Sequence, residues 1–412
     1  MRLIRLLFFF SSAVLIAAES RAQKGLNSIY SAYGIGDYRM RDQNAFLGMG
    51  NTGVALPSEY SINEINPSSF AWLPKNNLRL ELTLGGLSTK YVNENTNTSA
   101  GDFTFSRVAL SAQLVDPIRT VIGLRRFSQV EYYTTSFRDI AGTNDKISSA
   151  VEGNGGLYQF YIGNALKLGK NLAFGVNTGF IFGSVNTKET MNLSEAESLI
   201  IENNDYYNHG SISAGLQYQL KGKTSKWMFG AFYEPQIRMN QLRENQLKNQ
   251  DDVVLSEKDA EYDKFVFPQK YGGGVSFTRN SFTATVDVIG HLWSSTGYEG
   301  NHFTTTDSYS WSAGIRKQYT KKTVWGEVLG LALQAGYNYE NSYLIIDGNN
   351  IKAQSFTLGV VIPSSNNMNY YSVGMKIGSR GVAVYPLVKE KFFEFNVNFS
   401  LGSIFYKGRK LD

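Results

Sequence analysis

Three glycines near the N-terminus have the spacing of a phosphate-binding loop. In LGMGNTGVAL, Gly48, Gly50 and Gly53 form the pattern G-x-G-x-x-G, with which a Rossmann fold approaches a pyrophosphate. That fold needs a strand before the motif, a helix starting within it and an acidic residue about 20 positions later. Here the polar segment Arg41–Asn44 precedes the motif and Pro57 soon follows it. The sequence therefore argues against a dinucleotide site.

Other signals of enzyme chemistry are weak. His209, His291 and His302 have no second histidine or glutamate at the spacing of a metal site. Asp287 lies four residues before His291, and we interpret the two as a polar pair lining a pore. The Gly222–Thr224 segment (GKT) imitates the end of a P-loop but lacks the glycine five residues earlier. We therefore predict no enzymatic activity, no cofactor and no metal site.

The first 22 residues have the pattern of a secretory signal peptide. Arg2 and Arg5 precede an apolar run from Leu6 to Ala18, and small residues follow before the expected cleavage site. The run is shorter than the roughly 20 residues of a membrane-spanning helix. The chain has no cysteine, which excludes structural disulfides, cysteine-ligated zinc and a lipidated N-terminal cysteine. We expect export and removal of residues 1–22.

The composition favours a membrane β-barrel. Aromatic residues make up 14% of the chain, with 40 glycines and only 8 prolines, as suits strands with aromatic girdles at two interfaces. A mean hydropathy of −0.24 is compatible, because only every second residue of such a strand faces lipid. The formal net charge of +5 falls to +3 without the signal peptide. This small, dispersed charge predicts no nucleic-acid partner.

Strict alternation of apolar and polar residues supports the same class. It occurs in three clear runs: 281–293, 371–378 and 393–405. The apolar positions of each run share one face and the polar positions share the other. The polar faces carry Asp287, His291, Lys376 and Glu394, which we expect to face a barrel lumen.

Counting strand-like runs predicts an all-β, fourteen-stranded antiparallel transmembrane barrel. The runs centre near residues 83, 108, 124, 162, 178, 214, 231, 272, 286, 312, 332, 356, 373 and 399. Short and long connectors alternate between them, as in bacterial barrels with short periplasmic turns and long outer loops. The short connectors are 115–119, 168–171, 221–225, 279–281, 319–323 and 363–367. The long ones are 91–101, 135–155, 188–205, 242–263, 294–307, 341–350 and 379–390. A soluble β-sandwich gives no reason for loops to lengthen at one end only.

The even strand number places both ends of the barrel in the periplasm. We therefore divide the chain into a signal peptide (1–22), an N-terminal periplasmic-side hatch (23–76), the barrel (77–406) and a polar C-terminal tail (407–412). A barrel of this size has room for a plug in its lumen. The expected location is the outer membrane of a Gram-negative bacterium, in contact with lipid and lipopolysaccharide.

The N-terminal segment also resembles a known family. Tyr30–Leu73, with its glycine-rich stretch, an MG step and the pair Asn66-Pro67, looks like the hatch of FadL/TodX outer-membrane channels for hydrophobic compounds, in the form found in Bacteroidetes. Looser similarities continue to Lys389–Lys410. Members of that family form fourteen-stranded barrels plugged by the hatch. Asn66-Pro67 is followed here by serine where fatty-acid channels have alanine. The resemblance therefore does not establish that the hatch gates the passage of a ligand.

The resemblance implies passive transfer of hydrophobic small molecules, such as long-chain fatty acids. A ligand would enter an apolar pocket, the hatch would shift, and the ligand would leave sideways into the bilayer past a kinked strand. Gly48, Gly50, Gly53, Asn66 and Pro67 would then be hatch or gating residues. The glycines serve equally well if they only let a plug fold in a crowded lumen.

A second hypothesis is a barrel that transports nothing. FadL-like barrels of the same bacterial group also serve as structural or adaptor subunits of outer-membrane machines for protein secretion or insertion. A polar lumen containing Asp287, His291, Lys376 and Glu394 favours this role, in which outer-membrane proteins are the partners. A general diffusion porin is a weaker third choice, because a plug of about fifty residues would obstruct the pore. The sequence leaves the first two hypotheses open.

Overall fold

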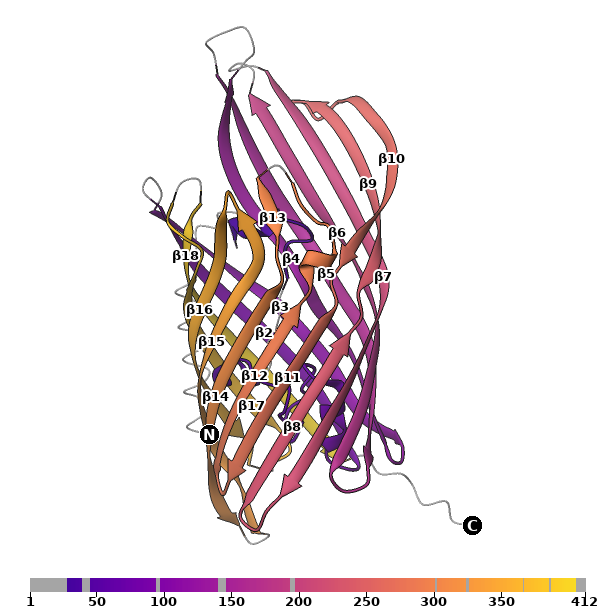
Figure 1. Ribbon diagram of the computed structural model, residues 1–412, viewed down its shortest axis with the longest axis vertical. Coiled ribbons are helices and arrows are strands. Elements are labelled where there is room, and N and C mark those ends of the chain that lie inside the picture. Colours follow the sequence, from indigo (N-terminus) through magenta and orange to yellow (C-terminus); the bar gives the residue numbers. More distant parts are fainter. Residues whose placement is uncertain are drawn as a thin grey trace.

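The computed structural model describes most of the chain. The described residues are 28–38, 45–93, 97–139, 146–192, 197–300, 302–323, 326–365, 367–384 and 387–404. The expected signal peptide (1–22) and polar tail (407–412) lie outside them. In the described part, strands dominate and form a closed barrel (Figure 1). The helices among these residues are short 3-10 turns, and no helix in the described part is long and apolar enough to cross a membrane.

Fourteen antiparallel strands close the barrel, as the sequence predicts; two of them are each interrupted once, so they comprise sixteen segments. Their bounds are β2 Asn77–Val92, β3 Asn97–Val115, β4 Ile118–Asp139, β5 Lys146–Leu168, β6 Leu172–Asn192, β7 Ser198–Lys221, β8 Ser225–Glu234, β9 Ile237–Asn249, β10 Val254–Phe267, β11 Lys270–Arg279, β12 Phe282–His291, β14 Ser308–Thr323, β15 Gly326–Ile346, β16 Asn349–Pro363, β17 Tyr370–Arg380 and β18 Lys389–Ile404. The pairs β8/β9 and β10/β11 each follow one another along a single strand of the wall, interrupted near Pro235 and Pro268. The ladder between β18 and β2 closes the barrel.

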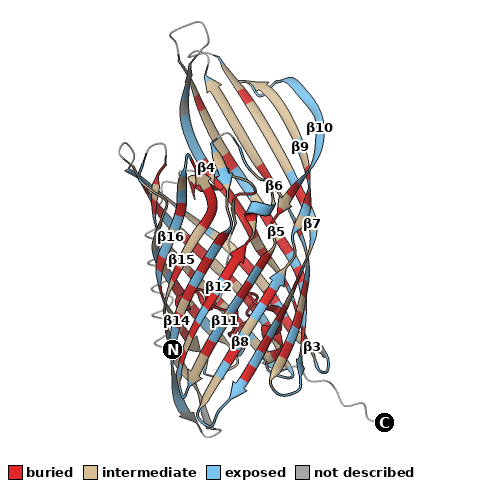
Figure 2. Ribbon diagram, in the orientation of Figure 1, coloured by how far each residue is buried: buried red, intermediate tan, exposed pale blue. Residues whose placement is uncertain are grey.

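The alternation of residue types matches the two faces of the wall. On β12 the side chains of Phe282, Val286 and Val288 are 40–53% exposed, while Asp287 and His291 are fully buried. Exposed and buried residues alternate along most strands in the same way (Figure 2). An exposed apolar face and a buried polar face are what a bilayer outside and a filled lumen inside require. The interior is therefore polar where it meets the wall of β12.

The orientation of β12 predicts that the Val286 side chain faces lipid. Replacing it by arginine puts a cation on the lipid face near the middle of the wall, at a cost of roughly 2–4 kcal/mol. Unfolding in urea from lipid vesicles should measure that loss. Leu255→Arg, on a strand outside the expected bilayer, is the control and should change stability little; equal losses at both positions would contradict the assigned lipid face.

Most of the predicted long outer loops are strands instead. The region 242–263, predicted as a loop, contains most of the β9–β10 hairpin, and β4 to β7 also continue past the expected loop starts. Cross-strand ion pairs stabilise this continuation: Arg243 Nε lies 2.6 Å from Asp205 Oδ1, and Lys248 contacts Glu202. A sheet can continue into water when its polar side chains pair across strands.

One predicted short turn is also misplaced. The sequence predicts a connector at 319–323, but β14 runs to Thr323 and pairs there with Gly326 of β15. The residues between them, 324 and 325, lie outside the described part. Threonine and tyrosine favour strands. The β14–β15 hairpin therefore extends further toward the periplasm than the two lysines of 319–323 suggest.

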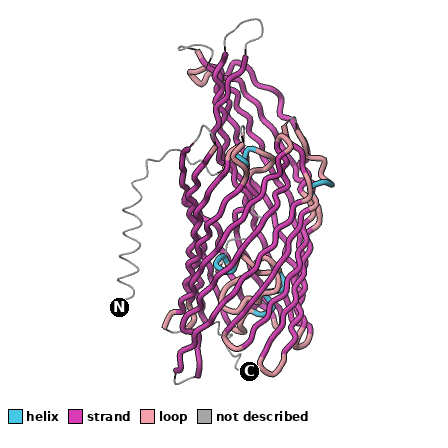
Figure 3. Tube along the Cα trace, turned by 60° about the vertical axis from the view of Figure 1, so that its left-hand side comes forward, coloured by secondary structure: helices cyan, strands magenta, loops and turns pink. Residues whose placement is uncertain are grey.

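The N-terminal segment lies inside the barrel in two parts. We call residues 28–38 the upper strap; they include η1 (Ile29–Ala32) and β1 (Asp37–Tyr38). We call residues 45–73 the lower plug; they include η2 (Leu47–Met49) and η3 (Pro67–Trp72). Figure 3 shows short helices enclosed by the strands. A further 3-10 turn, η4 (Trp293–Ser295), and the short β13 (Phe303–Thr305) lie between β12 and β14.

The upper strap departs from the expected periplasmic-side hatch. It contacts the outer ends of β17 and β18: Asp37 pairs with Arg380 at 3.0 Å, and the Ser28 hydroxyl donates to Glu390 at 2.7 Å. These ends lie opposite the short turns, on the extracellular side. Charged partners at the outer ends of the strands hold the strap there, whereas Glu59 of the lower plug contacts Lys226 beside a short turn.

Candidate functional site: the plug and its seat

The predicted glycines lie where the lower plug touches the barrel wall. The side-chain hydroxyl of Thr357 on β16 donates to the carbonyl of Gly48 at 3.0 Å and accepts from the amide of Gly50 at 2.8 Å. Gly50 has φ 68° and ends the turn η2, a backbone conformation that glycine adopts without strain. Both glycines are buried. They allow close packing between plug and wall.

The wall contributes glycines of its own at the same contact. At each of them an added Cβ would come under 3.0 Å from an atom of the lower plug, closer than real Cβ atoms pack. These wall glycines are Gly163, Gly175, Gly215, Gly230, Gly314, Gly336, Gly359 and Gly374. They belong to eight different strands, from β5 round to β17. We call this set the glycine seat; it holds the plug on most sides, at five of the eight positions by direct contact between backbones.

Asp287 binds the plug directly. Its Oδ2 accepts hydrogen bonds from the amides of Gly53 and Val54 at 2.6 and 2.8 Å. Asp287 is fully buried, and hydrogen bonds to a charged acceptor are stronger than those between neutral groups. This predicted lumen-facing residue thus fixes the chain at the third glycine of the motif. It holds a peptide backbone and is not aimed at an open pore.

Asn66 and Pro67 start the last turn of the plug. The Asn66 Oδ1 accepts from the amide and hydroxyl of Ser68, at 3.1 and 2.7 Å, and caps η3, with Pro67 in its first turn. The Asn66 Nδ2 donates to the carbonyl of Val54 at 2.9 Å and to that of Leu216 on β7 at 3.1 Å. The asparagine therefore joins two parts of the plug to the wall, and proline fits the first position of a helix.

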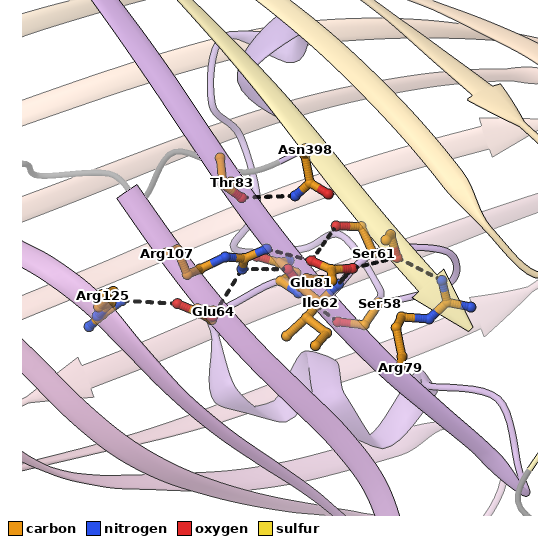
Figure 4. A network of polar contacts seen from close by, with 12 residues as sticks. Ser58, Ser61, Ile62, Glu64, Arg79, Glu81, Thr83, Arg107, Arg125 and Asn398 are labelled. Carbon is orange, nitrogen blue, oxygen red and sulfur yellow. Dashed lines mark hydrogen bonds and ion pairs between the residues drawn. The ribbon is translucent and has the colours of Figure 1, made fainter. Parts of the chain in front are cut away.

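A buried ion cluster joins the plug to β2 and β3 (Figure 4). Arg107 pairs with Glu64 of the plug at 2.9 Å, contacts Glu81 of β2, and donates to the carbonyl of Ile62 at 3.0 Å. Each of these three charged residues is at most 4% exposed. Glu81 also accepts from the amide of Ile62 at 2.8 Å. One arginine thus compensates two carboxylates, one on each side of the interface.

Further side chains complete this cluster. The Arg125 guanidinium lies 3.8 Å from Glu64, and the Tyr161 hydroxyl donates to the same carboxylate. Arg79 donates to the carbonyl of Tyr60 at 2.9 Å. None of these residues was predicted from the sequence. Their signal is a charge at a lumen-facing position of an alternating strand, as at Arg79 and Glu81 in LRLEL.

The plug also has charged contacts at its periplasmic mouth. Lys226 of β8 lies 3.0 Å from Glu59, and Arg316 of β14 lies 3.9 Å from it. Desolvation opposes ionisation of Glu59, but the two cations outweigh it and hold the pKa of this carboxyl below its usual value. Arg316 also donates to the Tyr60 hydroxyl at 2.5 Å. Glu59 is therefore an ionised anchor.

The extracellular half of the lumen is filled by an apolar cluster. Tyr30 and Ile35 of the upper strap pack there with aromatic residues of the wall, including Phe267, Trp293 and Tyr343. The predicted lumen residue His291 is fully buried and packs edge-to-face against Tyr38 at 5.3 Å. His291 therefore meets the upper strap whereas Asp287 meets the lower plug. The apolar part of this lumen is occupied by side chains of the protein itself.

A polar cavity of about 130 Å³ separates the strap from the plug. Asp37, Lys376, Arg380, Glu390 and Glu394 all line it. Lys376 and Glu394, both predicted to face the lumen, pair at 3.6 Å. Among the described residues no group of three or more histidines or acids has a metal-binding arrangement. The cavity suits water or small polar solutes better than an acyl chain.

The wall is split between β3 and β4 on its extracellular side. Their ladder runs from Val115↔Ile118 up to Arg107↔Arg125. Above it, β3 pairs with β2, while β4 pairs with β1 of the upper strap at Ser128 and Gln129. Side chains bridge the split: Arg126 donates to Thr104 at 2.6 Å and Gln129 to Asp102 at 3.0 Å. The split is thus occupied by the strap and by polar contacts.

The chain is similar in sequence to a protein family and in fold to several solved structures. A family model described as BamG matches residues 3–412, and no curated protein sequence matches.

Among solved structures, a Pseudomonas aeruginosa FadL homologue aligns with a TM-score of 0.62 and 13% identity, covering 90% of this chain and 100% of its own. The Pseudomonas putida toluene transporter TodX aligns with a TM-score of 0.62 and 16% identity, with the same coverage. The Ralstonia pickettii toluene transporter TbuX gives 0.60 and 13%, covering 88% and 99%. At these identities the likeness to FadL and TodX is one of fold.

Proposed function

The chain belongs to the BamG family, and from that membership we propose that this outer-membrane barrel is a structural subunit of an outer-membrane complex for protein insertion or secretion. The name of the family points to a BAM-related role. The chain uses no cofactor and catalyses no reaction in this proposal; it supplies a rigid barrel to which other outer-membrane proteins bind.

The observation that carries the proposal is the way the plug is held. The glycine seat packs against it on eight strands, Asp287 binds its backbone, and Arg107 joins it to the wall through buried charges. A plug that must move aside for each ligand would have to break these contacts together, and a buried charge left without its partner costs about 3–5 kcal/mol. These contacts favour a fixed plug and a non-transporting barrel.

The first experiment extracts the protein gently from its own outer membrane and measures the mass and stoichiometry of the extracted particle. The second measures uptake of hydrophobic compounds by a strain that lacks the protein. The proposal expects a stoichiometric complex with other membrane proteins and unchanged uptake. A monomer that carries bound lipid or fatty acid, together with lost uptake on deletion, would overturn it.

Passage of hydrophobic compounds is the second candidate, and the split between β3 and β4 favours it. In that role the split would be an exit into the bilayer, and Arg126 and Gln129 would restrict it.

Substituting Arg126 and Gln129 by alanine tests this candidate. The two candidates predict different results: a lateral exit freed of its polar bridges should pass a fluorescent fatty acid faster, whereas a fixed structural barrel should leave uptake at the wild-type rate. We expect no change. Uptake that rises several-fold in the double variant, and not in Asn186→Ala on β6, would favour transport instead.

A further inference from the structure

The β9–β10 hairpin stands outside the bilayer on one side of the barrel only. Figure 1 shows it above the level where β14 to β16 end. The first eleven residues of β10, Val254 to Lys264, are all exposed. Tyr262 is 84% exposed, and Val254 and Leu255 are about half exposed. A strand in a finished sheet normally buries one of its faces, so both faces of β10 lack a cover within the described chain.

Among the described residues, no strand pairs with the second edge of β10; we call this edge, opposite β9, the outer edge. Its ladder is with β9, from Val254↔Lys248 to Phe267↔Ile237. The next strand round the barrel, β12, ends at His291, opposite Lys270 of β11. From Val254 to Lys264 the outer edge of β10 therefore faces solvent over a length typical of a strand that binds another chain.

The charge of this edge selects what can bind there. From Asp251 to Lys264 the hairpin has six acidic residues and two lysines. Two of the three basic residues of β9 are already paired, Arg243 with Asp205 and Lys248 with Glu202. The third, Arg238, lies opposite Val266, outside the Val254–Lys264 stretch. A second copy of the hairpin would bring like charges together, and anionic lipopolysaccharide would be repelled. A segment with lysine and arginine side chains complements the edge.

We propose that the outer edge of β10 is a docking site for an extended, basic segment of an extracellular protein partner, which adds to the sheet as a further strand. The main-chain groups of Val254–Lys264 supply the hydrogen bonds, and the acidic side chains select the partner. This inference rests on the proposed function, since it names one contact of the complex.

Hydrogen exchange read by mass spectrometry tests the docking site. The amides of Val254–Lys264 are compared in the intact complex and in the subunit released from it. We expect exchange at least about tenfold slower in the complex, confined to this edge and its contacts. A complex in which this edge exchanges as fast as in the released subunit would overturn the docking site and leave the structural role standing. Absence of any complex would overturn both.

Charge reversal gives an independent readout. Glu257→Lys with Asp259→Lys should lower the retained partner about tenfold or more at low salt, with less effect at high salt, where charges are screened. Glu299→Lys with Asp116→Lys makes the same change of charge at exposed positions elsewhere and should retain the partner. The folded barrel is checked for both by its resistance to unfolding in detergent. Equal retention in both folded double variants would contradict the proposal.

Discussion

Gly336→Val is expected to displace the lower plug and destabilise the barrel. An added Cβ at Gly336 would meet the backbone of Met49 and Gly50 at under 3.0 Å, where no side chain can rotate away. Overpacking a core costs typically about 1–3 kcal/mol, and a clash between two backbones belongs at or above the upper end. We expect a loss of about 3 kcal/mol in urea unfolding, and a lumen that conducts ions in planar bilayers.

Gly273→Val is the matched control. It also places a valine in a barrel strand, but an added Cβ there has no atom within 4 Å, and valine favours strands. We expect its stability to equal or exceed that of the parent protein, with no added conductance. Equal behaviour of the two variants would show that the plug adapts to the wall and is not held by the glycine seat.

Arg107→Met is expected to have the second large effect. It leaves Glu64 and Glu81 buried next to each other without the cation that contacts both. Removing one partner of a buried ion pair typically costs about 3–5 kcal/mol, because the remaining charge is uncompensated. The loss should appear as a lower urea midpoint and as faster proteolysis of the lower plug.

The control removes all three charges. Combining Arg107→Met with Glu64→Gln and Glu81→Gln should restore most of the lost stability, because neither buried carboxylate is then left without Arg107. Arg125, 3.8 Å from Glu64, keeps its hydrogen bond to Gln159 at 2.8 Å. If the triple variant is as unstable as Arg107→Met, the cluster acts by packing and not by charge.

The strands could be predicted because the residue types within each strand alternate with the environments of its two faces. A lipid face and a polar lumen impose a period of two on segments such as Phe282–His291, and short turns separate them. The fourteen strand centres are accordingly confirmed. Most of the predicted long outer loops were wrong because polar strands in water have no apolar face to reveal them, whereas most of 379–390 and most of 294–307 do lie between strands. The ion pairs that stabilise them, such as Arg243 with Asp205, join residues far apart in the sequence.

The plug contacts were harder to predict because they too join residues that lie far apart in the sequence. The pattern of Gly48, Gly50 and Gly53 suggested either movement or close packing, and only their neighbours distinguish the two. Those neighbours are Thr357 and the wall glycines such as Gly359, some three hundred residues away. A glycine in a strand indicates a close approach but does not say of what.

The central claim, a plug that stays fixed while the protein works, is tested most directly by linking the plug to the wall. The chain has no cysteine, so Glu59→Cys and Lys226→Cys can be joined specifically by a short bis-maleimide; the parent side chains pair at 3.0 Å at the periplasmic mouth. In cells carrying only this variant, we predict that the linked and unlinked proteins retain the same partners and support the same growth. Loss of growth, or of uptake of a hydrophobic compound, only when the link is made would contradict the account.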